Sequence, residues 1–194
     1  AMESTIKESF GKDWAKGDIK ENALVETSPI AAQKIYLVNR PGSVQSSIKL
    51  GNLGIKKTDP DYFKILVMND VLGGSAHSRL FENIRESKGY TYGAYSSSAA
   101  RVHPDVFSAQ ADVRTEVTAP SLQEFLYELD RIRNVKVSQE ELDAAKSYLA
   151  GLFQLKLETQ SGLAQALLDA GLYNMPDDYL ENYTKKIMAV TVDD

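Results

Sequence analysis

Residues 72–92 have the sequence LGGSAHSRLFENIRESKGYTY, and this stretch predicts much of the fold. Gly73 and Gly74 end the helix that precedes them, and a second helix is expected over about 78–87. Gly89 then supplies a turn, after which a strand rich in aromatic residues begins. The stretch therefore predicts two helices that meet the edge of a sheet.

Two side chains in this stretch can donate hydrogen bonds where the second helix meets the sheet. Arg85 lies near the end of that helix, where a cation is favourable, and Tyr92 opens the strand. Donors at such a place would hold a substrate carbonyl or stabilise a developing oxyanion. A purely structural interpretation stays open, in which Arg85 pairs with Glu82 or Glu86 and Tyr92 is an ordinary strand residue.

A β-hairpin is expected on the N-terminal side of this stretch. Residues 34–39 are rich in β-branched and aromatic side chains and predict a strand, and residues 40–43 supply turn chemistry. Residues 44–50 alternate and predict a second strand that pairs with the first. The side chains expected on one face of that second strand are Val44, Ser46, Ile48 and Leu50.

The other elements are predicted from capping signals and helical spacing. Asp59 as N-cap and Pro60 at the first helical position begin the helix that ends at the glycine pair. Ser138 and Glu141 have the spacing of a capping box that opens a long helix. Strands are expected over 90–98 and 105–113, and further helices after Pro120 and over about 161–174 and 177–189. These elements predict one α+β domain, with a mostly antiparallel sheet and helices packed on one face.

The N-terminal 33 residues are expected to lie outside this domain. Residues 1–16 have a weak helical pattern that fits the end of a preceding domain, and residues 17–33 are polar and predict a linker. The domain itself is expected over 34–194. Ala1 and Met2 resemble a cloning remnant, and the chain stops where Thr191 would cap a new helix, so we expect a segment of a longer protein.

The composition is that of an ordinary globular protein and excludes several other classes. Of 194 residues, 43% are hydrophobic and 25% charged, which excludes a disordered tail, a collagen-like fibre and a coiled-coil rod. The net charge of −5 argues against nucleic-acid binding. The longest aliphatic run, residues 65–68, is far too short to cross a bilayer. With no cysteine, disulfides and thiolate zinc sites are excluded.

No hydrolytic or metal site is recognised in the chain itself. His77 and His103 belong to neither an HExxH nor an HxxEH motif, and both are interpreted as surface or loop histidines. Four carboxylates fall at expected helix starts, where capping of backbone N–H groups is preferred to metal binding; they are Asp59, Asp61, Asp177 and Asp178. We therefore expect no metal and no cofactor in this segment.

Three motifs follow one another at a specific spacing. They are RPGSVQSS at 40–47, LGG with SRLF at 72–81, and RE, KG and YG within 85–93. In this order the chain from about Lys34 to Asp194 resembles the C-terminal-type domain of the M16 zinc peptidases, the family of pitrilysin, insulin-degrading enzyme and mitochondrial processing peptidase. FGKDW at 10–14 resembles the end of the preceding domain's last helix.

The resemblance implies a function shared with a second domain. In that family one domain binds zinc through an HxxEH helix and a downstream Glu, and the other lends an Arg and a Tyr, seven residues apart, to the substrate backbone. Arg85 and Tyr92 have this separation, so the resemblance assigns them substrate and transition-state hydrogen bonding. Zinc-activated water would attack a peptide bond, with zinc and base in the partner domain, and this segment alone would be inactive.

The resemblance also implies the partners and leaves alternatives open. The expected partners are an HxxEH-bearing M16 domain or subunit and a peptide or unfolded polypeptide, and a dimer is one expected assembly. A bacterial periplasm or cell envelope is favoured over the cytoplasm. Two other functions stay open: a catalytically inactive scaffold or assembly subunit, and a domain that only binds and presents peptides. An HxxEH motif upstream or in a neighbouring gene would favour the peptidase.

Overall fold

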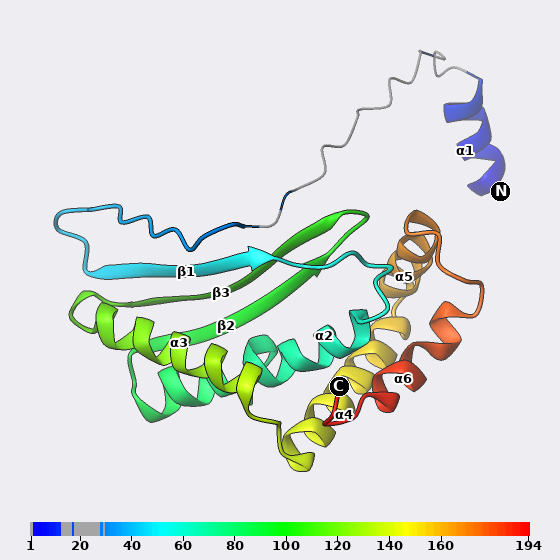
Figure 1. The fold of residues 1–194 in the computed structure, drawn as a ribbon. Helices are drawn as coiled ribbons and strands as arrows, with labels where there is room; N and C mark the ends of the chain where they lie inside the picture. The colour runs from blue at the N-terminus through cyan, green and yellow to red at the C-terminus, as the bar shows by residue number, and fades with distance from the viewer. Residues whose placement is uncertain (1, 13–16, 18–27, 29) are drawn as a thin grey trace.

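Three antiparallel strands form the sheet in the computed structural model, which describes residues 2–12, 17, 28 and 30–194 (Figure 1). The strands are β1 (Gln45–Leu53), β2 (Thr91–Ala100) and β3 (Pro104–Arg114), in the order β1-β3-β2. Ile48 of β1 and Ala94 of β2 both lie opposite Ala111 of the central strand. Their side chains are buried on one face of the sheet, as the alternating pattern requires.

Helices cover that face and confirm the predicted α+β arrangement (Figure 1). The helix α2 continues into a π-helical turn, η1, and the π-helix η2 follows; all three contact β2. The helix α3 contacts β1 and β3. The bounds are α2 (Tyr62–Asn69), η1 (Asp70–Gly74), η2 (Phe81–Ser87), the 3-10 turn η3 (Thr115–Val117) and α3 (Thr118–Asn134).

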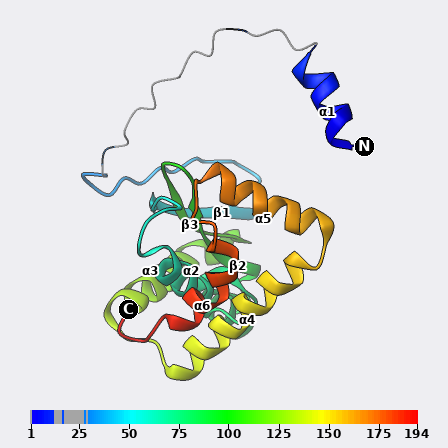
Figure 2. The same cartoon turned by 90° about the vertical axis from the view of Figure 1, so that its right-hand side faces the viewer.

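Three further helices stand together at one end of the sheet (Figures 1 and 2). They are α4 (Gln139–Leu157), α5 (Gln160–Leu172) and α6 (Tyr179–Ala189). The helix α4 contacts both α5 and α6, and it also contacts α2, which joins this helical layer to the sheet layer. Among the described residues, no helix is both long enough and apolar enough to cross a membrane.

The buried side chains form two clusters that meet at the α2–η1 helix. The sheet cluster lies between the strands and the helices η1, η2 and α3, and includes Leu72, Ile84, Val113 and Phe125. The helical cluster lies among α2, η1, α4 and α6, and includes Val67, Val71, Leu142 and Ile187. Val71 and Leu72 are neighbours in sequence but point into different clusters, so η1 belongs to both.

Of the two predicted helix starts, the one at α4 is confirmed and the one at α2 is wrong by two residues. The helix α2 begins at Tyr62, after Asp61, whose side chain makes no capping hydrogen bond. The Oδ1 of Asp59 accepts a hydrogen bond from the Asp61 backbone N–H at 2.9 Å in the turn before α2. At α4, the Glu141 N–H donates to Ser138 Oγ at 3.1 Å, and the Ser138 N–H donates to the Glu141 carboxylate at 2.9 Å. This reciprocal pair is the predicted capping box. It provides acceptors for two backbone N–H groups that have no hydrogen-bond partner within the helix.

The predicted strand over residues 34–39 is wrong. This segment has no strand structure, and Ile35, Tyr36 and Leu37 are 84%, 83% and 94% exposed. The turn itself forms, because the Ser43 N–H donates to the Arg40 carbonyl at 3.2 Å and Gly42 has φ +80°. With Pro before this glycine the turn is type II, whose twist splays the flanking strands instead of pairing them.

Two other expectations at the N-terminal side have different outcomes. The predicted start of the second strand at Val44 is wrong by one residue, because β1 begins at Gln45 and Val44, which precedes it, is 84% exposed. The weak helical pattern is confirmed as α1 (Met2–Gly11). Trp14 and most of the linker predicted over 17–33 lie outside the described residues. The domain boundary at residue 34 stays a prediction.

Candidate functional site

The junction between η2 and β2 carries both predicted site residues. The helix η2 ends at Ser87, and Gly89 takes φ +63°, a left-handed conformation that glycine adopts without strain. The Gly89 N–H donates to the Arg85 carbonyl at 2.9 Å, and the guanidinium of Arg114 donates to the Gly89 carbonyl at 3.1 Å. These bonds hold the turn against β3, so the separation between helix end and strand start is fixed.

Arg85 lies in the last turn of η2 with its guanidinium near the surface. Its side chain is 39% exposed and forms an ion pair with Glu86, in agreement with one part of the structural interpretation. The guanidinium also lies over the Phe81 ring, 4.9 Å from its centroid. Phe81 packs in turn against Tyr95 of β2, with ring centroids 5.5 Å apart. Arg85 is therefore supported from beneath by an aromatic pair while its charge faces solvent.

Tyr92 is displayed at the start of β2. The register between β2 and β3 shifts between Thr91 and Ala94, which is a β-bulge at Tyr92 and Gly93. The Tyr92 side chain is 89% exposed, whereas nearby Tyr90 is half-buried against the sheet cluster. The bulge therefore directs Tyr92 outward, and an exposed phenol at a strand edge is free to donate to a ligand.

The structure thus brings Arg85 and Tyr92 to one junction without pairing them. Each keeps a donor group at the surface, and the Arg85 guanidinium contacts Glu86 and Phe81. An acceptor such as a peptide carbonyl would have to bridge them.

A long-range ion pair that the sequence analysis missed anchors the start of η2. The Nε of Arg79 donates to Glu141 Oε1 at 2.7 Å and its Nη2 donates to Oε2 at 2.9 Å. Arg79 is only 7% exposed, and its hydrogen bond to Glu141 is the main reason that the pKa of this carboxyl falls to about 2. The two residues are far apart in sequence, and no local pattern links them.

The described residues do not fit a zinc site. Among residues 2–12, 17, 28 and 30–194, no three His, Cys, Asp or Glu side chains are grouped so as to hold a metal. His77 interacts electrostatically with Asp70, whose pKa burial raises to about 6, but no third ligand from the described part of the chain joins them. Asp178 precedes α6 and accepts a hydrogen bond from the Asn182 side chain at 2.7 Å. A zinc ion could not be held by these groups alone.

A cavity between α4, α5 and α6 was not predicted from the sequence. Its polar groups include Lys57, Asp169, Tyr179 and Tyr183. The spacing of Tyr179 and Tyr183 places both rings on one face of α6, but this is also the pattern of an ordinary buried face. Nothing in the sequence distinguishes the two.

Comparisons with known proteins identify the class to which this fold belongs. A family model described as the peptidase M16 inactive domain matches residues 1–149, which is most of the chain. The chain therefore belongs to this family, as the motifs of the sequence predicted.

The relatives include a protein named as a zinc protease, a protein named as a probable inactive metalloprotease, and a solved M16 inactive domain. An uncharacterized zinc protease of Streptomyces coelicolor is 28% identical over 84% of this chain and 36% of its own length. The crystal structure of an M16 inactive domain from Pseudomonas fluorescens is 31% identical, with a TM-score of 0.71, over 78% of this chain and 36% of that one. The Bacillus subtilis protein named "Probable inactive metalloprotease YmfF" is 24% identical over 73% of this chain and 34% of its own length. The chain thus spans about a third of the length of these relatives.

Proposed function

We propose that this chain is the substrate-binding, metal-free half of an M16-type zinc metallopeptidase. In this proposal it completes the active-site chamber with a partner domain that carries HxxEH, and the pair hydrolyses peptide bonds. The observation that carries the proposal is the η2–β2 junction, which holds a guanidinium and an exposed phenol seven residues apart in a member of this family.

Arg85 and Tyr92 would act on the carbonyl oxygen of the bound peptide. The guanidinium and the phenol are both hydrogen-bond donors, and such bonds strengthen as the oxygen gains negative charge. Arg85 must leave Glu86 to reach a substrate, but this ion pair is at the surface, where breaking it costs little. The relative from Streptomyces coelicolor is named as a zinc protease, and in this proposal the zinc ion is bound by the partner domain, because the described residues of this chain do not fit a zinc site.

The test is peptide hydrolysis by the longer protein that joins this chain to its HxxEH-bearing half. Cleavage of a quenched fluorogenic peptide is compared for the wild type, Arg85→Ala and Tyr92→Phe, each with and without a chelator. We expect chelator-sensitive cleavage, and a kcat that falls by about tenfold or more in each variant, because each loses one donor to the developing oxyanion.

Matched controls separate this role from a general effect on folding. Arg101→Ala removes a 75% exposed arginine from the β2–β3 hairpin, and Tyr127→Phe alters a 56% exposed tyrosine on α3. Both controls should keep the wild-type kcat. If Arg85→Ala and Tyr92→Phe also keep it, the two residues leave the mechanism, although the family assignment stands.

A second candidate function is a catalytically inactive scaffold or assembly subunit. It is favoured by the similarity to YmfF, a relative whose name includes the word inactive. If a folded assembly of both halves cleaves no member of a varied peptide set, this candidate replaces the first.

The proposal includes the setting in which the chain works. We expect a peptide or unfolded polypeptide as substrate, a partner M16 domain or a second copy as the assembly, and a bacterial cell envelope as the location. Cell fractionation and light scattering of the longer protein test the last two expectations.

A further inference from the structure

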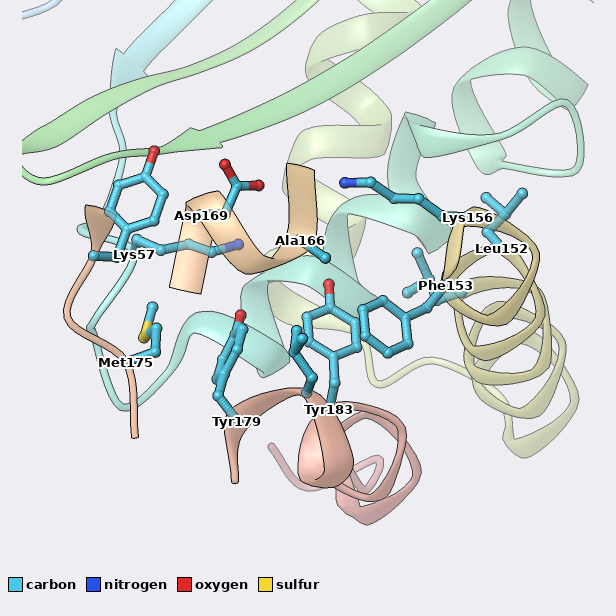
Figure 3. Close-up of a pocket in the computed structure, with 12 residues that line it drawn as sticks. Lys57, Leu152, Phe153, Lys156, Ala166, Asp169, Met175, Tyr179 and Tyr183 are labelled. Atoms are coloured by element: carbon cyan, nitrogen blue, oxygen red, sulfur yellow. The ribbon is translucent and has the colours of Figure 1, made fainter. Parts of the chain in front are cut away.

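A cavity of about 200 Å³ lies among α4, α5 and α6, in the helical layer at the end of the sheet (Figure 3). Its walls are mainly apolar and aromatic. They include Leu149, Leu152, Phe153, Ala166, Met175 and Leu180. The Phe153 and Tyr183 rings stack with centroids 4.0 Å apart, and Tyr179 meets Tyr183 edge-on at 5.7 Å. An apolar cavity of about 150 Å³ can hold a benzene ring, so this one has room for a ring with a small polar group.

One polar group in the cavity wall has no partner among the described residues. Tyr179 is 6% exposed, and its hydroxyl makes no hydrogen bond to any of them. A buried hydroxyl without a partner is unfavourable, and its presence in a native structure calls for a ligand or an ordered water. Figure 3 shows this hydroxyl directed into the same space as the Lys57 amino group and the Tyr183 hydroxyl.

The polar groups at this point of the cavity favour an acceptor with negative charge. The amino group of Lys57 donates to the Tyr62 hydroxyl and lies 4.0 Å from the centroid of that ring. This amino group has further N–H groups that can donate hydrogen bonds. Burial lowers the pKa of Lys57 to about 8, and a bound anion would raise this pKa again. The charged groups that act on it are Asp169 of α5 and Lys156 of α4. Lys57 and Lys156 together outweigh the charge of Asp169, so this part of the cavity wall has a net positive charge.

We propose that this cavity binds a small aromatic monocarboxylate, whose carboxylate accepts hydrogen bonds from Lys57 and Tyr179 and whose ring lies among the apolar and aromatic walls. The ligand thereby satisfies the Tyr179 hydroxyl and adds a second negative charge near Lys57, besides that of Asp169. The cavity and the η2–β2 junction are built from different elements, so this inference does not depend on the peptidase proposal.

The experiment is a titration of the isotope-labelled chain with sodium benzoate, followed by the amide resonances of α4, α5 and α6. Two probes divide the ligand into its parts, since benzyl alcohol has the ring without the charge and acetate has the charge without the ring. We expect saturable shifts centred on the cavity with benzoate, and affinities for the other two that are weaker by about tenfold or more. Shifts that are equal for benzoate and acetate, or spread over the whole surface, would overturn the proposal.

Substitution of each polar residue shows whether that residue strengthens or weakens the binding of benzoate. Lys57→Met and Tyr179→Phe should each weaken benzoate binding by about tenfold, because each removes a donor to the carboxylate. Asp169→Asn should strengthen it, because a negative charge in the cavity wall that repels the incoming carboxylate is gone. Tyr127→Phe, an exposed tyrosine outside the cavity, is the matched control and should bind like the wild type.

The stability of the Tyr179→Phe variant also shows whether weaker benzoate binding results from a loss of folding. Because it removes an unpaired buried hydroxyl, the ligand-free variant should unfold at the wild-type temperature or above it. If it is stable and binds benzoate as tightly as the wild type, the hydroxyl serves only an ordered water and the proposal fails.

Discussion

At the scale of single residues, backbone geometry determines the positions of the Arg85 and Tyr92 side chains at the η2–β2 junction. Tyr92 is exposed because a bulge replaces regular pairing at the start of β2, and Arg85 lies over Phe81 because both belong to η2, one turn apart. Gly73 matters for a related reason at the end of η1. A Cβ at this position would lie 2.3 Å from the Ser96 backbone nitrogen, so only glycine allows η1 to approach β2 this closely.

The first prediction follows from this contact. Gly73→Ala should lower the free energy of unfolding by about 2 kcal/mol or more, because the clash is with the backbone of a strand and not with a movable side chain. Urea denaturation followed by circular dichroism measures the change.

A matched glycine gives the opposite expectation. A Cβ at Gly151, within α4, would meet no atom within 4 Å, so Gly151→Ala should raise the free energy of unfolding by about 0.5–1 kcal/mol through helix propensity. If Gly73→Ala and Gly151→Ala have the same free energy of unfolding, η1 does not approach β2 this closely in solution.

At the scale of elements, the start of α4 joins a local cap to a distant partner. Glu141 accepts the Ser138 N–H as part of the capping box and also holds Arg79 through two hydrogen bonds. The same carboxylate therefore begins the helix and attaches it to the segment that leads into η2. This attachment places α4 beside the strand-side helices in addition to the apolar packing between them.

Glu141→Gln tests this double role through its pH dependence. The pKa of Glu141 is lowered to about 2 in the folded state, chiefly by the Arg79 hydrogen bond, from an ordinary value of 4.5. Stabilisation by this carboxylate is therefore present above about pH 4.5 and is lost as the pH falls toward 2. We expect the variant to be less stable than the wild type by about 2 kcal/mol at pH 7, and the difference to shrink at about pH 3.5.

The control for this prediction is Glu140→Gln in the same helical turn. Glu140 is exposed, so this variant should change stability by only a few tenths of a kcal/mol at either pH. A pH-independent difference for Glu141→Gln would contradict the assigned ion pair.

At the scale of the whole molecule, the sheet cluster and the helical cluster are joined by shared residues, so we expect them to unfold as one cooperative unit. Ile132 near the end of α3 packs against both clusters, and η1 contributes Val71 to one and Leu72 to the other. Because each cluster shares side chains or backbone with the other, neither can unfold without removing contacts from both.

Ile132→Ala tests this coupling. Loss of the side chain should lower the free energy of unfolding by about 2 kcal/mol while thermal unfolding stays a single transition. Val135→Ala is the control, since Val135 is 56% exposed and its loss should have little effect. Two separate transitions in the wild type or in Ile132→Ala would show that the layers unfold independently.

Sequence reasoning succeeded where the information is local. The capping box at Ser138, the glycine stop and the two strands β2 and β3 all depend on residues that are close in the chain. The order and spacing of the motifs also predicted the correct family, because they are properties of the sequence alone. Arg85 and Tyr92 came from the same source, and their role stays a prediction.

Only the tertiary structure decided the features that join distant segments. Residues 34–39 have the composition of a strand, but a strand exists only where a neighbour supplies backbone hydrogen bonds, and the turn after Arg40 directs them elsewhere. The Arg79–Glu141 pair, the contact of Gly73 with β2 and the cavity beside Tyr179 are likewise set by packing. Propensity and caps act over a few residues, whereas these contacts depend on how whole elements come together in space.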